Sequence, residues 1–164
     1  MKVLINIPSL SLQGGVANHY LGLKPYWTER IFYNVVGRRK FGSGFLWFPF
    51  DIIKFVVKVL LVRPKLVLLN PSLALNATRR DLYFLKISLY LNQKTFIFFH
   101  GWNETTLSDD YKNKLALALN FSNGVIVLAE DFKTALLNWG VKIPIFLSTT
   151  KVDDRLITDF NPSM

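Results

Sequence analysis

The chain has 164 residues, of which 51% are hydrophobic and 19% are charged, so it can form one domain with a sizeable core and is too apolar to be disordered. It contains no cysteine, which excludes disulfides, thiolate metal sites and cysteine nucleophiles, and its two histidines lie far apart without carboxylates at metal-ligand spacing. We therefore expect no metal site. The formal net charge of +9 favours anionic partners, namely phosphorylated substrates, an anionic membrane surface or nucleic acid, although solubility alone is a sufficient reason for it.

Short apolar runs alternate along the chain with longer segments of helical periodicity. In chain order we expect a strand at 3–7, a helix at 17–29, a strand at 32–36, a loop at 37–48, a helix at 51–62, a strand at 66–69, a helix at 77–91, a strand at 95–99, a helix at 109–120, a strand at 125–128, a helix at 130–139 and a strand at 144–147.

The order of these elements predicts the fold class. Strands that alternate with helices form βαβ units and a mostly parallel sheet. The segments VLIN, LVLL, FIFF and VIVL are continuously apolar, as strands buried on both faces are. We therefore expect an α/β, Rossmann-like, doubly wound sheet of about six strands with helices on both faces.

The most hydrophobic segment, 45–62, is interrupted by Pro49 and by Asp51, Lys54 and Lys58, which would share one stripe of a helix. A membrane-spanning helix needs about 20 apolar residues with few charges. The segment therefore predicts a covered helix with a narrow polar face, and a helix lying in the membrane interface is the alternative. No signal peptide is visible, so we expect a cytoplasmic protein, with a peripheral position at the inner face of the membrane as a variant of that expectation.

In sheets of this class, ligands bind at the carboxyl ends of the strands, near the point where the strand order reverses. That rule selects the loops after the first, third, fourth and fifth expected strands. Their polar and glycine residues lie within 9–15, 70–73, 100–104 and 129–130. These loops are the candidate site.

Two motifs in these loops have more than one interpretation. Gly14 and Gly15 precede a helix, where free N–H groups and absent Cβ atoms let a phosphate approach, but they equally suit a turn or a close helix–strand contact. His100 follows an expected strand, where it could donate to an oxyanion or act as an acid or base, or simply be a hydrogen-bonded, partly buried histidine.

The basic run Arg38, Arg39 and Lys40 lies near Trp47 and other aromatic residues. Such a mixture could stack on single-stranded nucleic acid or contact a membrane surface, and the simplest interpretation is a solvated loop with an apolar anchor. The basic residues of the chain are scattered and no nucleic-acid-binding motif is present, so we expect no nucleic-acid partner.

Three segments together resemble a known family. They are KVLINIP followed by QGGV, then TFIFFHGWN, and then NGVIVLAEDFKTALLNWGVKIPIFLSTTKVDDRLI. In this order the chain resembles the N-terminal half of a GT-B glycosyltransferase of the family-4-like, retaining kind. The resemblance implies an acceptor-binding domain at 1–150, and the start of a linker at 151–164 toward a C-terminal nucleotide-sugar-binding domain that lies outside this chain, in cis or as a separate chain.

The resemblance also implies roles for individual residues. Gly14 and Gly15 match the loop that approaches the diphosphate of the donor, and His100 matches a catalytic histidine that faces the reacting sugar and phosphate. Contacts to the acceptor or the sugar are implied for Asn18, Asn70, Ser72, Asn103, Glu104 and Glu130. The surface around Arg38, Arg39, Lys40 and Trp47 would face the membrane or the acceptor. Ala129 departs from the family pattern, in which a serine is common.

The expected function follows from this resemblance. The chain would be the N-terminal domain of a metal-independent enzyme that moves a sugar from a nucleotide sugar, which is a substrate and not a cofactor, to a glycan or lipid-linked acceptor. By itself it would transfer sugar poorly or not at all. The alternatives are a non-catalytic subunit of a split glycosyltransferase that anchors it to a membrane or binds the acceptor, and a nucleic-acid-binding module.

Overall fold

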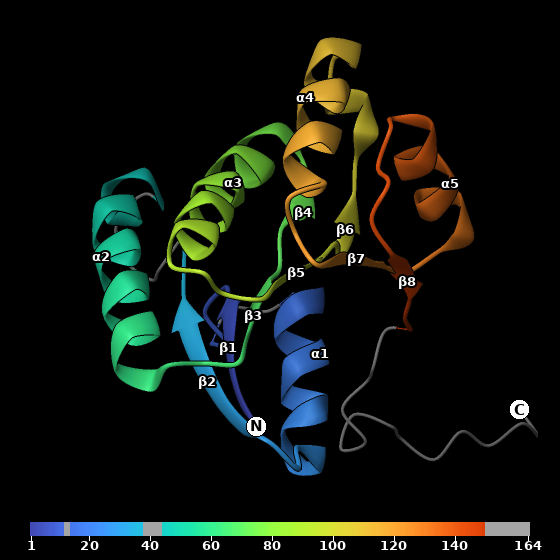
Figure 1. The fold of residues 1–164 in the computed structure, drawn as a ribbon. Helices are drawn as coiled ribbons and strands as arrows, with labels where there is room; N and C mark the ends of the chain where they lie inside the picture. Colours follow the sequence, from blue (N-terminus) through green and yellow to red (C-terminus); the bar gives the residue numbers. More distant parts are fainter. Residues whose placement is uncertain (12–13, 38–43, 150–164) are drawn as a thin grey trace, which may run out of the picture.

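The computed structural model describes residues 1–11, 14–37 and 44–149 (Figure 1). The main sheet consists of β1 (Lys2–Ile7), β2 (Arg30–Val35), β3 (Leu66–Leu69), β5 (Thr95–Phe98), β7 (Gly124–Val127) and β8 (Ile145–Leu147). The helices are α1 (Gly15–Leu23), α2 (Gly44–Val62), α3 (Leu75–Tyr90), α4 (Asp109–Leu119) and α5 (Glu130–Asn138). The short elements are β4 (Ser72–Leu73), β6 (Gly101–Trp102) and the 3-10 helices η1 (Lys24–Tyr26) and η2 (Glu104–Thr106).

All six strands of the main sheet are parallel, in the order β2-β1-β3-β5-β7-β8. The chain passes from β1 outward to β2, returns past β1 to β3, and continues through β5 and β7 to β8. The direction of winding reverses between β1 and β3. This reversal is the switch point at which ligands bind to such sheets.

Helix α1 covers one face of the sheet, and helices α2 to α5 cover the other (Figure 1). Right-handed crossovers require this division, because the β1–α1–β2 unit winds in the direction opposite to the later units. Side chains of β1 alternate accordingly. Ile5 packs with Tyr20 of α1, whereas Leu4 belongs to the core cluster that contains Phe55 of α2 and Phe84 of α3. The predicted α/β class, the six strands and the helices on both faces are confirmed.

Helix α2 differs from the expectation. The segment 37–48 was expected to be a loop, but the helix already begins at Gly44 and contains Pro49. A proline inside a helix removes one backbone hydrogen bond and crowds the preceding turn. Packing compensates for this cost, because the ring of Phe48 contacts the rings of Tyr83 and Phe84 of α3 at centroid distances of 5.5 and 6.2 Å.

Two smaller differences affect the candidate loops. The expected helix at 17–29 ends at Leu23 and continues only as η1, which has Pro25 in its first turn. Residues Ser72 and Gly101, expected in loops, pair instead in the two-stranded parallel sheet of β4 and β6. Two-residue strands leave no periodic pattern in a sequence, so only the contact between the two loops reveals them.

Some expectations concern parts of the chain outside the description. Arg38, Arg39 and Lys40, and the expected linker at 151–164, lie outside the described residues. Among the residues that are described, no helix combines the length and apolarity that a membrane crossing needs.

Candidate functional site

Polar side chains from three elements meet at the switch point of the sheet. Asn70 directly follows β3, and His100 lies two residues after the end of β5. Tyr20 belongs to α1, the helix that covers one face of the sheet. The carboxyl ends of parallel strands lie at one edge of a sheet, so β3 and β5 bring Asn70 and His100 together although 30 residues separate them.

The side chain of Asn70 holds this cluster together. Its Oδ1 atom accepts a hydrogen bond from the Tyr20 hydroxyl at 2.6 Å and lies 3.0 Å from Nε2 of His100. Its Nδ2 atom donates to the carbonyl of Asn6 at 2.8 Å. Because an amide NH₂ must face that carbonyl, Oδ1 must face the other two groups. His100 therefore carries its proton on Nε2, and its Nδ1 atom has a lone pair that no described residue engages.

The surroundings control the charge of the cluster. Burial, followed by the electrostatic interaction with nearby His19, lowers the pKa of His100 to about 3. Burial raises the pKa of Tyr20, despite the hydrogen bond to Asn70, which opposes that shift. At neutral pH the site therefore presents a neutral imidazole and a protonated phenol. A bound anion would stabilise the imidazolium and raise the pKa of His100 again.

His19 and Tyr20 are site residues that the sequence analysis missed. The buried ring of His19 lies 4.7 Å from the ring of His100 and 5.5 Å from that of Phe98, in edge-on contacts. The two histidines are far apart in the sequence, but α1 places them together. The available signal was helical spacing, because His19 follows Gly15 by four residues and so lies on the same side of α1 as its first turn.

The structure narrows the interpretation of the two glycines. Gly14, the N-cap of α1, has an extended backbone with φ of 167°, which any residue adopts. A Cβ atom built on Gly14 or Gly15 would meet nothing within 4 Å. A close helix–strand contact therefore does not require glycine here, and the interpretation as a turn stays untested because residues 12–13 lie outside the described residues. The first turn of α1 has no acidic residue and no side-chain cap, so the approach of a phosphate stays a prediction.

Three of the remaining predicted residues lie in the segments next to Asn70 and His100 in the sequence. Ser72 lies beside the site, because it pairs with Gly101, the neighbour of His100. Asn103 and Glu104 begin η2, where the Asn103 side chain accepts a hydrogen bond from Thr105 at 2.7 Å. No described hydrogen bond joins Asn103 or Glu104 to His100.

Of the other predicted contact residues, Asn18 and Glu130 are exposed and Trp47 is half-buried. Asn18 is exposed in the first turns of α1. Glu130 is exposed at the start of α5, with Lys133 at 3.6 Å. Trp47 lies in α2, with its ring centroid 6.0 Å from that of Phe50, and not in a loop as expected. No described hydrogen bond connects Glu130 or Trp47 with the cluster around Asn70.

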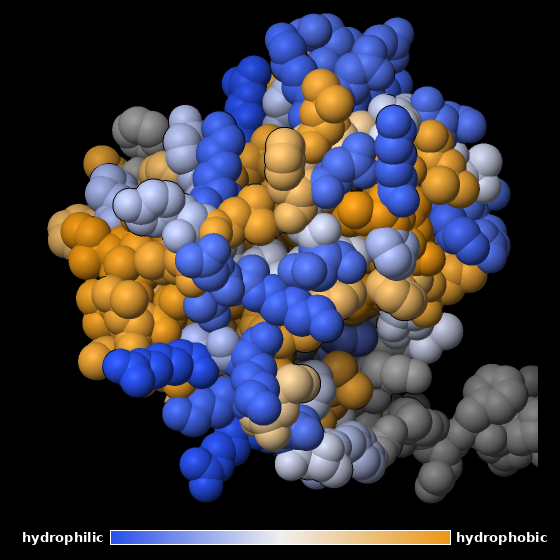
Figure 2. Space-filling view, viewed as in Figure 1, coloured by the Kyte–Doolittle hydropathy of each residue, from blue (hydrophilic) through white to orange (hydrophobic). Residues whose placement is uncertain are grey.

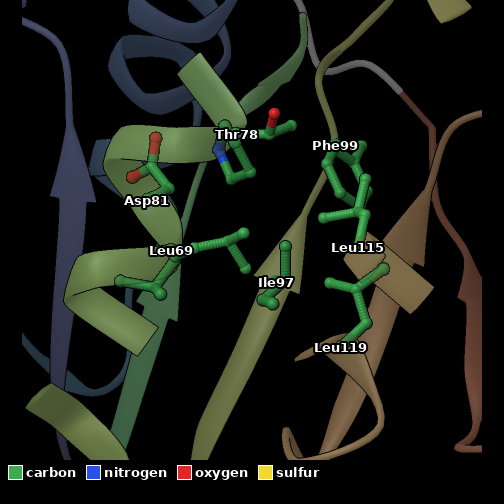
Figure 3. A pocket seen from close by; sticks show the side chains of 9 residues that line it. Leu69, Thr78, Asp81, Ile97, Phe99, Leu115 and Leu119 are labelled. Carbon is green, nitrogen blue, oxygen red and sulfur yellow. The ribbon is translucent and has the colours of Figure 1, made fainter. Parts of the chain in front are cut away.

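Other places in the described part of the chain are less suited to a ligand. A cavity between α3, α4 and the sheet has a volume of about 10 Å³, room for a single water molecule, and its lining is mostly aliphatic and aromatic (Figure 3). Asp81, at its edge, has one carboxylate oxygen without a hydrogen-bond partner, and burial raises the pKa of this carboxyl group. Among described residues, no group of three or more His, Cys, Asp or Glu side chains could hold a metal ion.

Comparison with solved structures finds a similar fold. The fold is similar to that of a UDP-GlcNAc 2-epimerase from Methanocaldococcus jannaschii, with a TM-score of 0.57 and 14% sequence identity. The similarity covers 90% of this chain but only 45% of the other protein, so the chain spans less than half of its length. No protein-family model matches the chain, and no curated protein matches its sequence significantly. The likeness shows the fold alone, which is Rossmann-like and corresponds to one half of a GT-B-like protein.

Proposed function

We propose that the chain is the acceptor-side domain of a glycosyltransferase that moves a sugar from a nucleotide sugar to a glycan or lipid-linked acceptor, without a metal ion and with retention. The observation that carries the proposal is the neutral His100, held by Asn70 and Tyr20 at the switch point with Nδ1 unengaged by described residues. The GT-B-like fold supports it, because a neighbour with that fold is named for a UDP-sugar.

The proposed chemistry uses this geometry in two ways. The diphosphate would lie at the amino end of α1, where the helix dipole and free N–H groups favour an anion and the open space at Gly14 and Gly15 admits it. Nδ1 of His100 would accept a hydrogen bond from a sugar hydroxyl. As negative charge develops on the leaving diphosphate, the pKa of His100 would rise, and Nδ1 would take the proton of the acceptor hydroxyl as its oxygen bonds to the sugar and the bond between sugar and diphosphate breaks. Asn70 and Tyr20 position the ring and set its tautomer.

The second half of the cleft would come from a further domain or another chain, since this chain spans 45% of the similar structure. That part would hold most of the nucleotide. A second candidate function is epimerisation of a sugar nucleotide, which the name of the similar protein favours. The two candidates differ in their products: transfer releases a nucleoside diphosphate and forms a new glycosidic bond, whereas epimerisation of an intact nucleotide sugar returns a nucleotide sugar.

The test uses the full-length protein with UDP-GlcNAc, UDP-glucose and GDP-mannose, each with and without a lipid extract as the acceptor source. We expect acceptor-dependent release of UDP or GDP, and a loss of at least about 100-fold in rate for His100→Gln, which is within the range that acid–base groups contribute. Asn138→Ala, an exposed position in the last turn of α5, is the matched control and keeps the rate.

Two results would overturn the proposal. Consumption of nucleotide sugar at the same rate in His100→Gln would remove the role of the histidine. Conversion of UDP-GlcNAc to another UDP-sugar without released UDP would replace transfer by epimerisation.

A further inference from the structure

The outer side of α2 is apolar and uncovered in the described part of the chain. Its large side chains there are between 46% and 77% exposed, although the opposite side of the same helix packs Phe55 and Val59 into the core. The space-filling view shows the resulting hydrophobic patch over the position of α2 (Figure 2). We call these residues the α2 stripe: Leu46, Phe50, Ile53, Val57, Leu60 and Leu61.

The spacing of the stripe is that of a single helix face. Successive members are separated by three or four residues, except for the adjacent Leu60 and Leu61. They therefore form a continuous band along α2. Scattered exposed apolar residues need no explanation, but a contiguous band of six large ones on a single helix marks an interaction surface.

Along the segment that holds α2 and α3, the charges are mostly positive. From Gly44 to Lys94 the chain has eight Lys or Arg residues and two acidic residues, Asp51 and Asp81. These two carboxylates are 0% and 4% exposed, with Lys54 and Arg80 as their respective ion-pair partners. The exposed surface of α2 and α3 therefore carries cations and no anion.

Exposed basic residues follow α2 in the chain and also lie on the neighbouring helix α3. Arg63 and Lys65 are exposed shortly after the last residue of the stripe and line a surface hollow together with Lys2 and Arg30. Glu29 also lines this hollow, where its carboxylate pairs with the N-terminal ammonium group. On α3, Arg79 and Lys86 line a second hollow with Tyr83. The ring of Tyr83 contacts Phe48 of α2, which joins this second basic region to the helix that carries the stripe.

The combination of an apolar helix face, flanking Lys and Arg, and exposed aromatic residues is typical of a helix that lies in the plane of an anionic membrane. Pairing of two copies through this face would bring cations against cations. We infer that the outer face of α2, with the basic residues that flank it on α3 and after Val62, docks the protein on the surface of an anionic phospholipid bilayer. This docking is independent of the proposed sugar transfer, because none of its residues belongs to the His100 cluster.

The first test is co-sedimentation of the purified protein with vesicles of phosphatidylcholine containing 30% phosphatidylglycerol, compared with pure phosphatidylcholine. We expect binding to the anionic vesicles that weakens in high salt. The double variant Ile53→Glu/Leu60→Glu should lower the apparent partition coefficient at least about tenfold. Arg63→Gln and Lys65→Gln should lower it about fivefold for each charge that faces lipid. Leu117→Glu, at an equally exposed leucine on α4, stays within about twofold of the unchanged protein.

A second test locates the contact. The chain has no cysteine, so Ile53→Cys can carry a single environment-sensitive fluorophore. Its emission shifts to shorter wavelength on anionic vesicles and not on addition of soluble glycerol phosphate, whereas the same label at Leu117→Cys does not respond.

Three outcomes overturn the inference: no binding to anionic vesicles, unchanged binding of the stripe variant when its urea unfolding is normal, or a blue shift at Leu117→Cys alone. Sedimentation velocity tests the alternative occupant. If the protein forms a concentration-dependent dimer that Ile53→Glu/Leu60→Glu abolishes, and if it does not bind vesicles, the stripe is a contact between two copies of the chain.

Discussion

Replacement of Asn70 by alanine should destabilise the protein more than its size suggests. The Asn70 side chain serves three partners at once, because it accepts from Tyr20 and His100 and donates to the carbonyl of Asn6. Tyr20 is 1% exposed, so water cannot replace the lost acceptor of its hydroxyl group. The variant leaves a buried donor unsatisfied.

The magnitude follows from these contacts. A buried polar group that loses its partner costs about 1–3 kcal/mol, and a lost hydrogen bond to a half-buried partner contributes about 0.5–1.5 kcal/mol. We expect Asn70→Ala to lower the free energy of unfolding by about 2–4 kcal/mol. Tyr20→Phe should lower it less, because Asn70 then keeps His100 as a partner.

Urea unfolding followed by circular dichroism measures these values, with the exposed Asn138→Ala as the control expected within about 0.5 kcal/mol of the unchanged protein. In a double-mutant cycle, Asn70→Ala and Tyr20→Phe should couple by about 0.5–3 kcal/mol. A cost below about 0.5 kcal/mol for Asn70→Ala, or additive effects in the cycle, would refute the hydrogen-bonded cluster. The ¹⁵N shifts of the imidazole give an independent check, since they distinguish a proton on Nε2 of His100 from one on Nδ1.

Three further predictions follow from the same structure. Burial lowers the pKa of His100 from about 6.5 in the unfolded chain to about 3, so its contribution to stability is complete above pH 6.5 and declines as the pH falls toward 3. The free energy of unfolding should change by less than about 1.4 kcal/mol per pH unit, because the ring is partly exposed. Between pH 7 and 4 the unfolding free energy of His100→Gln should depend less steeply on pH, and equal slopes for the two proteins would contradict this prediction. Gly14→Ala and Gly15→Ala should leave the free energy of unfolding unchanged or raise it by up to about 1 kcal/mol, since a Cβ meets open space there, while weakening binding of UDP-GlcNAc in calorimetric titrations at least about tenfold; unaltered binding would remove the phosphate role. Gly124→Ala should cost about 1–3 kcal/mol in urea unfolding, because its Cβ would lie 2.8 Å from Cε1 of Phe96, and a neutral effect would show that this ring moves freely.

The strands were the most predictable part of the fold. Each central strand is a continuous apolar run, because parallel strands between two layers of helices are buried on both faces. Such burial can be recognised from consecutive residues alone. The start of α2 was not predictable in the same way. Pro49 and the glycines before it indicate a loop by local preference, and only the ring contacts of Phe48 with α3 explain why the helix begins at Gly44.

The candidate site was predictable in part for the same reason. The rule that ligands bind at the carboxyl ends of strands placed Asn70 and His100 at one edge of the sheet before any contact was known. It did not indicate that their side chains would share a hydrogen bond, or that α1 would bring His19 and Tyr20 onto them. It also included Glu130, which the structure places on the exposed start of α5.

By itself, the sequence determined the α/β class, the parallel sheet and the sheet edge that Asn70 and His100 share, because burial on two faces and strand direction leave local patterns. The tertiary structure decided the proton position and the low pKa of His100. The proton position depends on Asn70, 30 residues away, and the low pKa depends first on burial and then on His19, 81 residues away. It also decided that the outer side of α2 is exposed. Hydrophobicity shows that a helix has apolar residues, but only the packing of its neighbours shows which of them are left uncovered.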